Sequence, residues 1–174
     1  MNSNSSPAES GVHPAVLVVG YGRQHHGDDI LGPQIAAEVA NWQLPQVKTC
    51  VVEQLTSKLA GSLAVADYAI FVDACRMATS EIRVSTVVPH GTETSGSSTP
   101  GLGHALAPAS LLALTQSVYG RSPQTWWVEI PATDFTDGEL SPSAQAELMK
   151  ALDAISRLIQ SILSPSQPIE PTTS

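Results

Sequence analysis

The residues best able to bind a metal or move a proton stand next to apolar segments of the chain. Asp29 follows the apolar run at 15–20, Asp73 ends the run at 68–73, and His104 precedes a predicted helix. In open parallel sheets, ligands bind beyond the carboxyl ends of the strands. Two carboxylates and one imidazole at such an edge suit a borderline divalent metal with coordination positions left open. Asp29, Asp73 and His104 are therefore the candidate metal-binding and catalytic set.

Each of these residues also has an ordinary structural interpretation. An acid in the first turn of a helix is favoured by the helix dipole. An aspartate at a strand end often only caps a turn, and a lone histidine is more often a surface residue. Because the set contains no thiolate, it would hold a metal weakly and would need further ligands from a partner. Cys75 paired with His104 as a nucleophile is a further alternative, although a small buried thiol is the commoner case.

The turn Gly20-Tyr21-Gly22 suggests a second kind of site, because it resembles the start of a dinucleotide-binding motif. The third glycine of that motif falls on His25, so the phosphate turn is incomplete. The adjacent carboxylates of Asp28 and Asp29 would also repel phosphates. The sequence contains neither a GxSxG turn nor an HExxH helix, so serine hydrolases and zincins lack their signatures. Nucleotide binding is thus a disfavoured alternative.

Apolar runs typical of buried parallel strands alternate with helical patterns along the chain. The expected strands lie at 15–20, 47–52, 68–73, 82–88 and 125–130, and the expected helices at 33–42, 56–66, 108–119 and from 141 to about 162. The alternating pattern at 82–88 predicts a more exposed strand at an edge. The order predicts an α/β fold of three layers, in which a twisted, largely parallel five-stranded sheet lies between helices and is mixed if the later strands run antiparallel.

The length of 174 residues predicts one domain. We expect it to span residues 13–163, between Ser- and Pro-rich disordered tails at 1–12 and 164–174. The polar loop at 90–103 is expected to close over a bound substrate.

The charge balance and the apolar runs limit the partners. A net charge of −8 argues against nucleic acid and anionic lipid, which need a basic patch. The apolar runs are too short to span a membrane, and no export signal is visible. The two cysteines favour the reducing cytoplasm and free thiols, with a disulfide between Cys50 and Cys75 left open.

Three motifs in register resemble those of the [NiFe]-hydrogenase maturation endopeptidases. They are Val18–Gly22 with Gly27–Gly32, then Ile70–Ala74, and finally Gly103–His104 with Ala107–Leu112. The positions that contact metal in that family correspond to Asp29, Asp73 and His104. The chain departs from the family at Arg23, where asparagine is usual, and at Ile30, where glycine is frequent.

The resemblance implies a peptidase that removes a short carboxyl-terminal extension from the hydrogenase large-subunit precursor after nickel insertion. The nickel would belong to the substrate, and no permanently bound cofactor is expected. Either the nickel or one of the two carboxylates would activate water. The segments at 53–56 and 130–135 are most similar to the branch that serves the bidirectional, NAD-linked hydrogenase. A non-catalytic, metal-sensing binder of the same precursor is the alternative, suggested by Arg23 and Ile30.

Overall fold

Strands and helices follow one another in the order that the apolar runs predict. The computed structural model describes residues 15–90 and 105–164. The strands are β1 (Val16–Tyr21), β2 (Val47–Val52), β3 (Tyr68–Cys75), β4 (Arg83–Val87) and β5 (Gln124–Pro131). The helices are α1 (Leu31–Asn41), α2 (Ala60–Ala64), α3 (Pro108–Tyr119) and α4 (Pro142–Leu163), with 3-10 turns η1 (Gly27–Ile30) and η2 (Ser57–Leu59).

The strands form one five-stranded sheet in the order β2-β1-β3-β5-β4. All neighbouring pairs are parallel except β4 and β5, which pair antiparallel. The prediction of a largely parallel sheet is therefore confirmed, and β4 makes the sheet mixed. The expected position of β4 at an edge is also confirmed.

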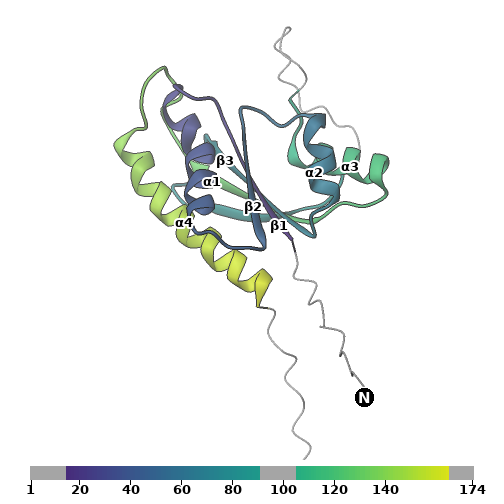
Figure 1. The fold of residues 1–174 in the computed structure, drawn as a ribbon. Coiled ribbons are helices and arrows are strands. Elements are labelled where there is room, and N and C mark those ends of the chain that lie inside the picture. The colour runs from purple at the N-terminus through teal and green to yellow at the C-terminus, as the bar shows by residue number, and fades with distance from the viewer. Residues whose placement is uncertain (1–14, 91–104, 165–174) are drawn as a thin grey trace, which may run out of the picture.

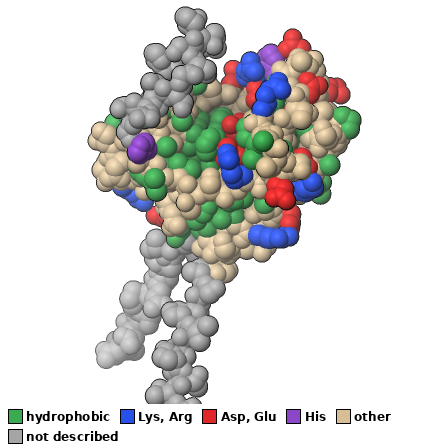
Figure 2. Space-filling view, turned by 180° about the vertical axis from the view of Figure 1, so that it is seen from behind, with side chains coloured by type: hydrophobic (Ala, Val, Ile, Leu, Met, Phe, Trp, Pro, Cys, Tyr) green, Lys and Arg blue, Asp and Glu red, His purple; other side chains and the backbone are tan. Residues whose placement is uncertain are grey.

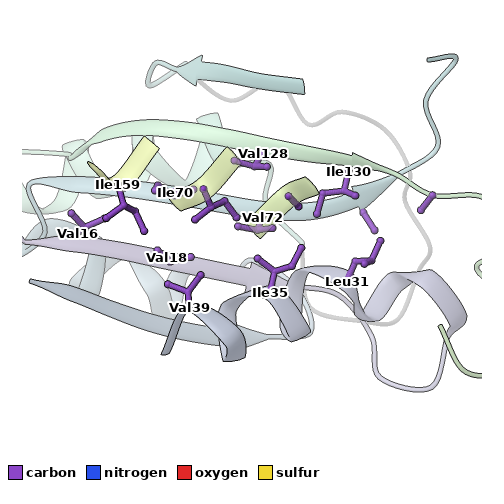
Figure 3. Packing of buried hydrophobic residues seen from close by; sticks show 14 of the residues in the cluster. Val16, Val18, Leu31, Ile35, Val39, Ile70, Val72, Val128, Ile130 and Ile159 are labelled. Atoms are coloured by element: carbon purple, nitrogen blue, oxygen red, sulfur yellow. The ribbon is translucent and has the colours of Figure 1, made fainter. Parts of the chain in front are cut away.

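Helices cover both faces of the sheet, as a three-layer fold requires. On one face lie α1 and α4 (Figure 1). There Ile35 of α1 and Ile159 of α4 are buried with Val18, Ile70 and Val128 of the strands (Figure 3). Because successive side chains of a strand point to opposite faces, every second residue of β1 and β3 enters this cluster.

The opposite face is covered by α2 and α3 (Figure 1). Leu63 of α2 and Leu111 of α3 are fully buried with Val19 and Phe71 of the strands. Both faces of the central strands are thus apolar, which explains why their sequences read as continuous apolar runs.

The ends of the helices follow from local chemistry. The Ser141 hydroxyl accepts a hydrogen bond from the Ala144 N–H at 3.2 Å, and Pro142 occupies the first turn of α4. Gly120 ends α3 in the left-handed conformation at φ 73°. Both boundaries were predicted from these residues.

Gly32 lets the start of α1 approach the sheet closely. A Cβ at this position would lie 2.5 Å from both the Tyr21 and the Val72 carbonyl oxygens. We expect Gly32→Ala to lower the free energy of unfolding by about 1–3 kcal/mol, because backbone must move to admit the methyl group. Urea unfolding followed by circular dichroism measures this loss.

Gly61→Ala in α2 is the matched control for that substitution. Its Cβ would meet only the end of the exposed Tyr119 side chain, the hydroxyl at 3.2 Å and Cζ at 3.9 Å, and alanine favours a helix more than glycine does. The control variant should be as stable as the wild type or more stable. Equal losses in both variants would contradict the close approach at Gly32.

Several predictions fall on residues that the structure does not describe. These are the tails at 1–12 and 165–174, the loop at 91–103 and His104. In the described ranges, no helix combines the length and apolarity needed to span a bilayer. Among the described side chains visible in Figure 2, basic residues stand beside acidic ones rather than in a patch of their own.

Candidate active site

The structure places Asp29 and Asp73 at the same edge of the sheet. Asp29 lies in η1, which follows the carboxyl end of β1, and Asp73 lies near the carboxyl end of β3, the strand beside β1. The neighbours Val72 and Ala74 point toward α1 and α4, so Asp73 points toward the α2 and α3 face. The two carboxylates are close enough that the charge of Asp29 acts on Asp73.

Asp73 is partly buried, and its surroundings disfavour the charged form. Burial raises the pKa of Asp73 to about 7, and the negative charges of Asp29 and Glu129 add to the rise. A hydrogen bond from the Tyr21 hydroxyl favours the charged form and opposes this effect. Asp73 is thus poised between its two protonation states near neutral pH, as a general acid or base requires.

Aromatic side chains form the wall beside Asp73. The Tyr21 ring meets the Phe71 ring edge to face, with centroids 6.5 Å apart. Burial and the Asp73 charge raise the pKa of Tyr21, so its hydroxyl stays protonated and available to Asp73. The Trp127 indole acts on the Tyr21 hydroxyl and lowers the pKa of Tyr21, which opposes the effect of burial. The Trp127 Nε1 itself is buried, and no described residue accepts a hydrogen bond from it in good geometry.

Among the described residues, the Asp29 side chain accepts hydrogen bonds through one of its two oxygens. Its Oδ2 accepts hydrogen bonds from the backbone N–H of Arg23 at 3.0 Å and from Nε of the same residue at 2.9 Å. Gly22, at φ 151°, allows this packing, because a Cβ there would lie 1.9 Å from the Asp29 carbonyl oxygen. The glycines of the Gly20-Tyr21-Gly22 turn therefore serve close packing around η1 and α1.

The neighbouring acid, Asp28, has a structural role that the sequence analysis missed. Its side chain is fully buried and accepts backbone hydrogen bonds from Thr133 at 3.2 Å, Asp134 at 3.0 Å and Ser141 at 2.9 Å. Burial acts to raise the pKa of Asp28, but these hydrogen bonds outweigh it and hold the pKa below its usual range. Asp28 thereby ties η1 to the segment between β5 and α4.

Glu129 is a further carboxylate that the sequence analysis did not select. It lies opposite Asp73 on the neighbouring strand β5 and is only 5% exposed. Arg83 of β4 binds both of its oxygens, with Nε to Oε2 at 2.5 Å and Nη2 to Oε1 at 2.6 Å. An acid within the apolar run at 125–130 was the available signal, because a buried carboxylate needs a partner.

Cys75 is not activated as a nucleophile. Burial raises its pKa to about 11, with the charges of Glu129 and Asp73 adding to the rise. The thiol is therefore protonated at neutral pH, and thiols react as thiolates. Cys50 and Cys75 are both free, which resolves the alternative of a disulfide between them.

The histidines near Asp29 contact other parts of the loop. His26 pairs through Nδ1 with Asp137 at 2.8 Å, and His25 accepts a backbone hydrogen bond from Gly138. Among the described residues, no group of three or more His, Cys, Asp or Glu side chains is arranged to hold a metal. His104, the third residue of the predicted set, lies outside the described residues.

The described chain resumes close to the same edge, one residue after His104. The Leu106 N–H donates a hydrogen bond to the Leu55 carbonyl at 2.9 Å, and Leu55 follows the carboxyl end of β2. The Leu106 side chain packs on the apolar cluster that includes Leu111. The chain therefore enters α3 on the face toward which Asp73 points.

The fold and the edge together define a three-layer α/β domain with two acids at the carboxyl edge of adjacent parallel strands, Asp29 after β1 and Asp73 among the last residues of β3. Solved structures with this fold include the hydrogenase maturating endopeptidase HybD from E. coli, with a TM-score of 0.66 and 21% identity over 84% of this chain and 93% of that one. The [NiFe] hydrogenase maturation protease HycI from Thermococcus kodakarensis has a TM-score of 0.65 and 18% identity over 86% and 95%. No protein-family model and no curated protein matches the chain. At these identities the likeness shows a shared fold.

Proposed function

We propose that this chain is an endopeptidase that removes the carboxyl-terminal extension of a [NiFe]-hydrogenase large-subunit precursor after nickel insertion. The observation that carries the proposal is the pair Asp29 and Asp73, at the same carboxyl edge of the sheet and close enough that the charge of one acts on the other. The same fold occurs in two proteins described as hydrogenase maturation peptidases, HybD and HycI. The three motifs that resemble this family support the same assignment.

In this proposal Asp29, Asp73 and His104 contact the nickel that the precursor carries. Nickel accepts carboxylate and imidazole ligands, and thiolates of the precursor would already hold it. This chain then needs no resident metal, because the ion arrives with the substrate. The position of Leu106 at the edge supports His104 as the third ligand.

Asp73 is the group we assign to water activation. Among the described residues, Arg23 pairs with Asp29 and Arg83 with Glu129, whereas no cation pairs with Asp73. As the oxygen of water attacks the scissile carbonyl carbon, Asp73 takes the proton of the water. That proton then passes to the leaving amide nitrogen as the C–N bond breaks, which leaves a new carboxyl and a new amine. The nickel would place the peptide against Asp73 and polarise the water or the carbonyl.

The choice of precursor is proposed to depend on segments 53–56 and 130–135. Both lie around the site: Leu55 anchors the chain before α3, while Thr133 and Asp134 donate hydrogen bonds to Asp28. Substitutions there would reshape the edge that meets the substrate. Because the sequences of these two segments resemble the branch that serves the bidirectional, NAD-linked hydrogenase, we propose that hydrogenase as the target. The free thiols support a location in the cytoplasm.

Cleavage of the precursor with and without nickel tests the proposed function. We expect the nickel-loaded precursor to lose its extension, as followed by mass spectrometry, while the nickel-free precursor stays intact. Equal cleavage of both forms would contradict nickel recognition. A loaded precursor that binds but keeps its extension would instead identify the chain as a non-catalytic binder.

A further inference from the structure

Arg23 contacts only one of the two carboxylate oxygens of Asp29 within the described residues, and this bears on metal binding. Backbone and side chain of Arg23 both donate to Oδ2 of Asp29, at 3.0 and 2.9 Å. Within the described part of the chain, Oδ1 accepts no hydrogen bond. We propose that Arg23 is a positioning residue, which fixes Asp29 through Oδ2 and presents Oδ1 to the metal of the substrate. This inference rests on the proposed function.

Comparison with two other arginine–carboxylate pairs shows what is particular to this one. Two guanidinium nitrogens of Arg83 bind the two oxygens of Glu129. Neither oxygen of that carboxylate is therefore free to bind a metal in the plane of the guanidinium. Arg121 makes a single contact with Asp67, from Nη2 to Oδ1 at 3.2 Å, far from the site at the amino end of β3. Of the arginines in residues 15–90 and 105–164, only Arg23 fixes a carboxylate at the site edge and leaves one of its oxygens without a hydrogen bond from those residues.

The exposure of the pair argues against a purely stabilising role. The Arg23 side chain is 56% exposed and that of Asp29 is 15% exposed. Ion pairs with an exposed partner contribute little to folding stability. The pair can nevertheless fix the orientation of the Asp29 carboxylate. A planar guanidinium holds its acceptor in one direction, which a lysine ammonium does not do. Groups that orient metal ligands commonly change metal affinity by about 10–100-fold.

The quantity that tests this role is the preference for the nickel-loaded over the nickel-free precursor, taken as the ratio of the two dissociation constants. Binding is measured in the Asp73→Asn background, which keeps the extension in place. Arg23→Ala should lower this preference by about tenfold or more, with binding of the nickel-free precursor unchanged. Arg23→Lys should not restore the preference, because it supplies charge without the Nε–H that Arg23 directs at Oδ2. Arg121→Ala is the control and should keep it.

A double-mutant cycle separates positioning from direct contact with the substrate. In a chain that already carries Asp29→Ala, adding Arg23→Ala should change the preference by less than about twofold. A further loss there would mean that Arg23 touches the substrate itself, and this would overturn the inference. An undiminished preference in both Arg23→Ala and Arg23→Lys would overturn it too. If the wild-type chain neither prefers to bind nor prefers to cleave the nickel-loaded precursor, the proposed function itself fails.

Discussion

Asp73→Asn is expected to lower the rate of precursor cleavage by about 10²–10⁴-fold, the usual contribution of a positioned general base. Asparagine keeps the shape of the side chain and can still bind through its oxygen, but it cannot take the proton of water. Single-turnover cleavage of nickel-loaded precursor, followed by mass, measures the effect. Asp67→Asn, at the opposite end of the same strand and paired with Arg121, is the matched control and should cleave at the wild-type rate.

The pH dependence of stability shows whether that loss comes from chemistry or from unfolding. Burial raises the pKa of Asp73 to about 7, whereas an unfolded aspartate has a pKa of about 3.9. The stability linked to this proton is therefore fully present below about pH 4 and is lost as the pH rises toward 7. Asp73→Asn should unfold at a higher temperature than the wild type near pH 8 and at a similar one near pH 3.5. A variant less stable near pH 8 would contradict the assigned burial.

Asp28→Ala is expected to lower the free energy of unfolding by about 3 kcal/mol or more, because three backbone N–H groups lose their buried acceptor. Asp28→Asn should cost less, since the amide oxygen still accepts from part of the set. Urea unfolding measures both variants. Asp153→Ala, which removes an exposed pair with Arg157 on α4, is the control and should change stability by less than about 1 kcal/mol.

Asp28 should also make the fold sensitive to acid. Its hydrogen bonds hold its pKa below the usual range, so its contribution is present at neutral pH and is lost as the pH falls through the folded value, below about pH 4. The stability of Asp28→Ala should thus fall less steeply in acid than that of the wild type. Parallel losses in the two proteins would show that Asp28 is not the group responsible.

The strands and helices could be predicted because their signals are local. Continuous apolar runs such as Val16–Tyr21 mark strands buried on both faces, and Ser141 and Gly120 mark helix ends through hydrogen bonding and a left-handed conformation. The antiparallel pairing of β4 with β5 depends on contacts between distant segments. Spacing along the chain therefore predicted an exposed strand at an edge and did not predict its direction.

For the acids of the site, too, local signals could be predicted from the sequence, whereas contacts between distant segments could not. The rule for carboxyl ends of parallel strands was enough to bring Asp29 and Asp73 together. It did not separate Asp28 from Asp29, because that difference depends on backbone groups more than one hundred residues away in the sequence. Glu129 was missed for a related reason: its partner Arg83 comes from the antiparallel strand.

X-ray absorption at the nickel edge is the most direct test of shared metal binding. Nickel-loaded precursor is mixed with this protein and frozen before cleavage, alongside mixtures that contain His104→Ala or Asp29→Ala. We predict that oxygen and nitrogen ligands join the nickel in the wild-type mixture, and that each substitution removes its own contribution. An unchanged nickel spectrum in the frozen wild-type mixture, from a precursor that the same protein binds and then cleaves when the mixture is left to react, would contradict the account.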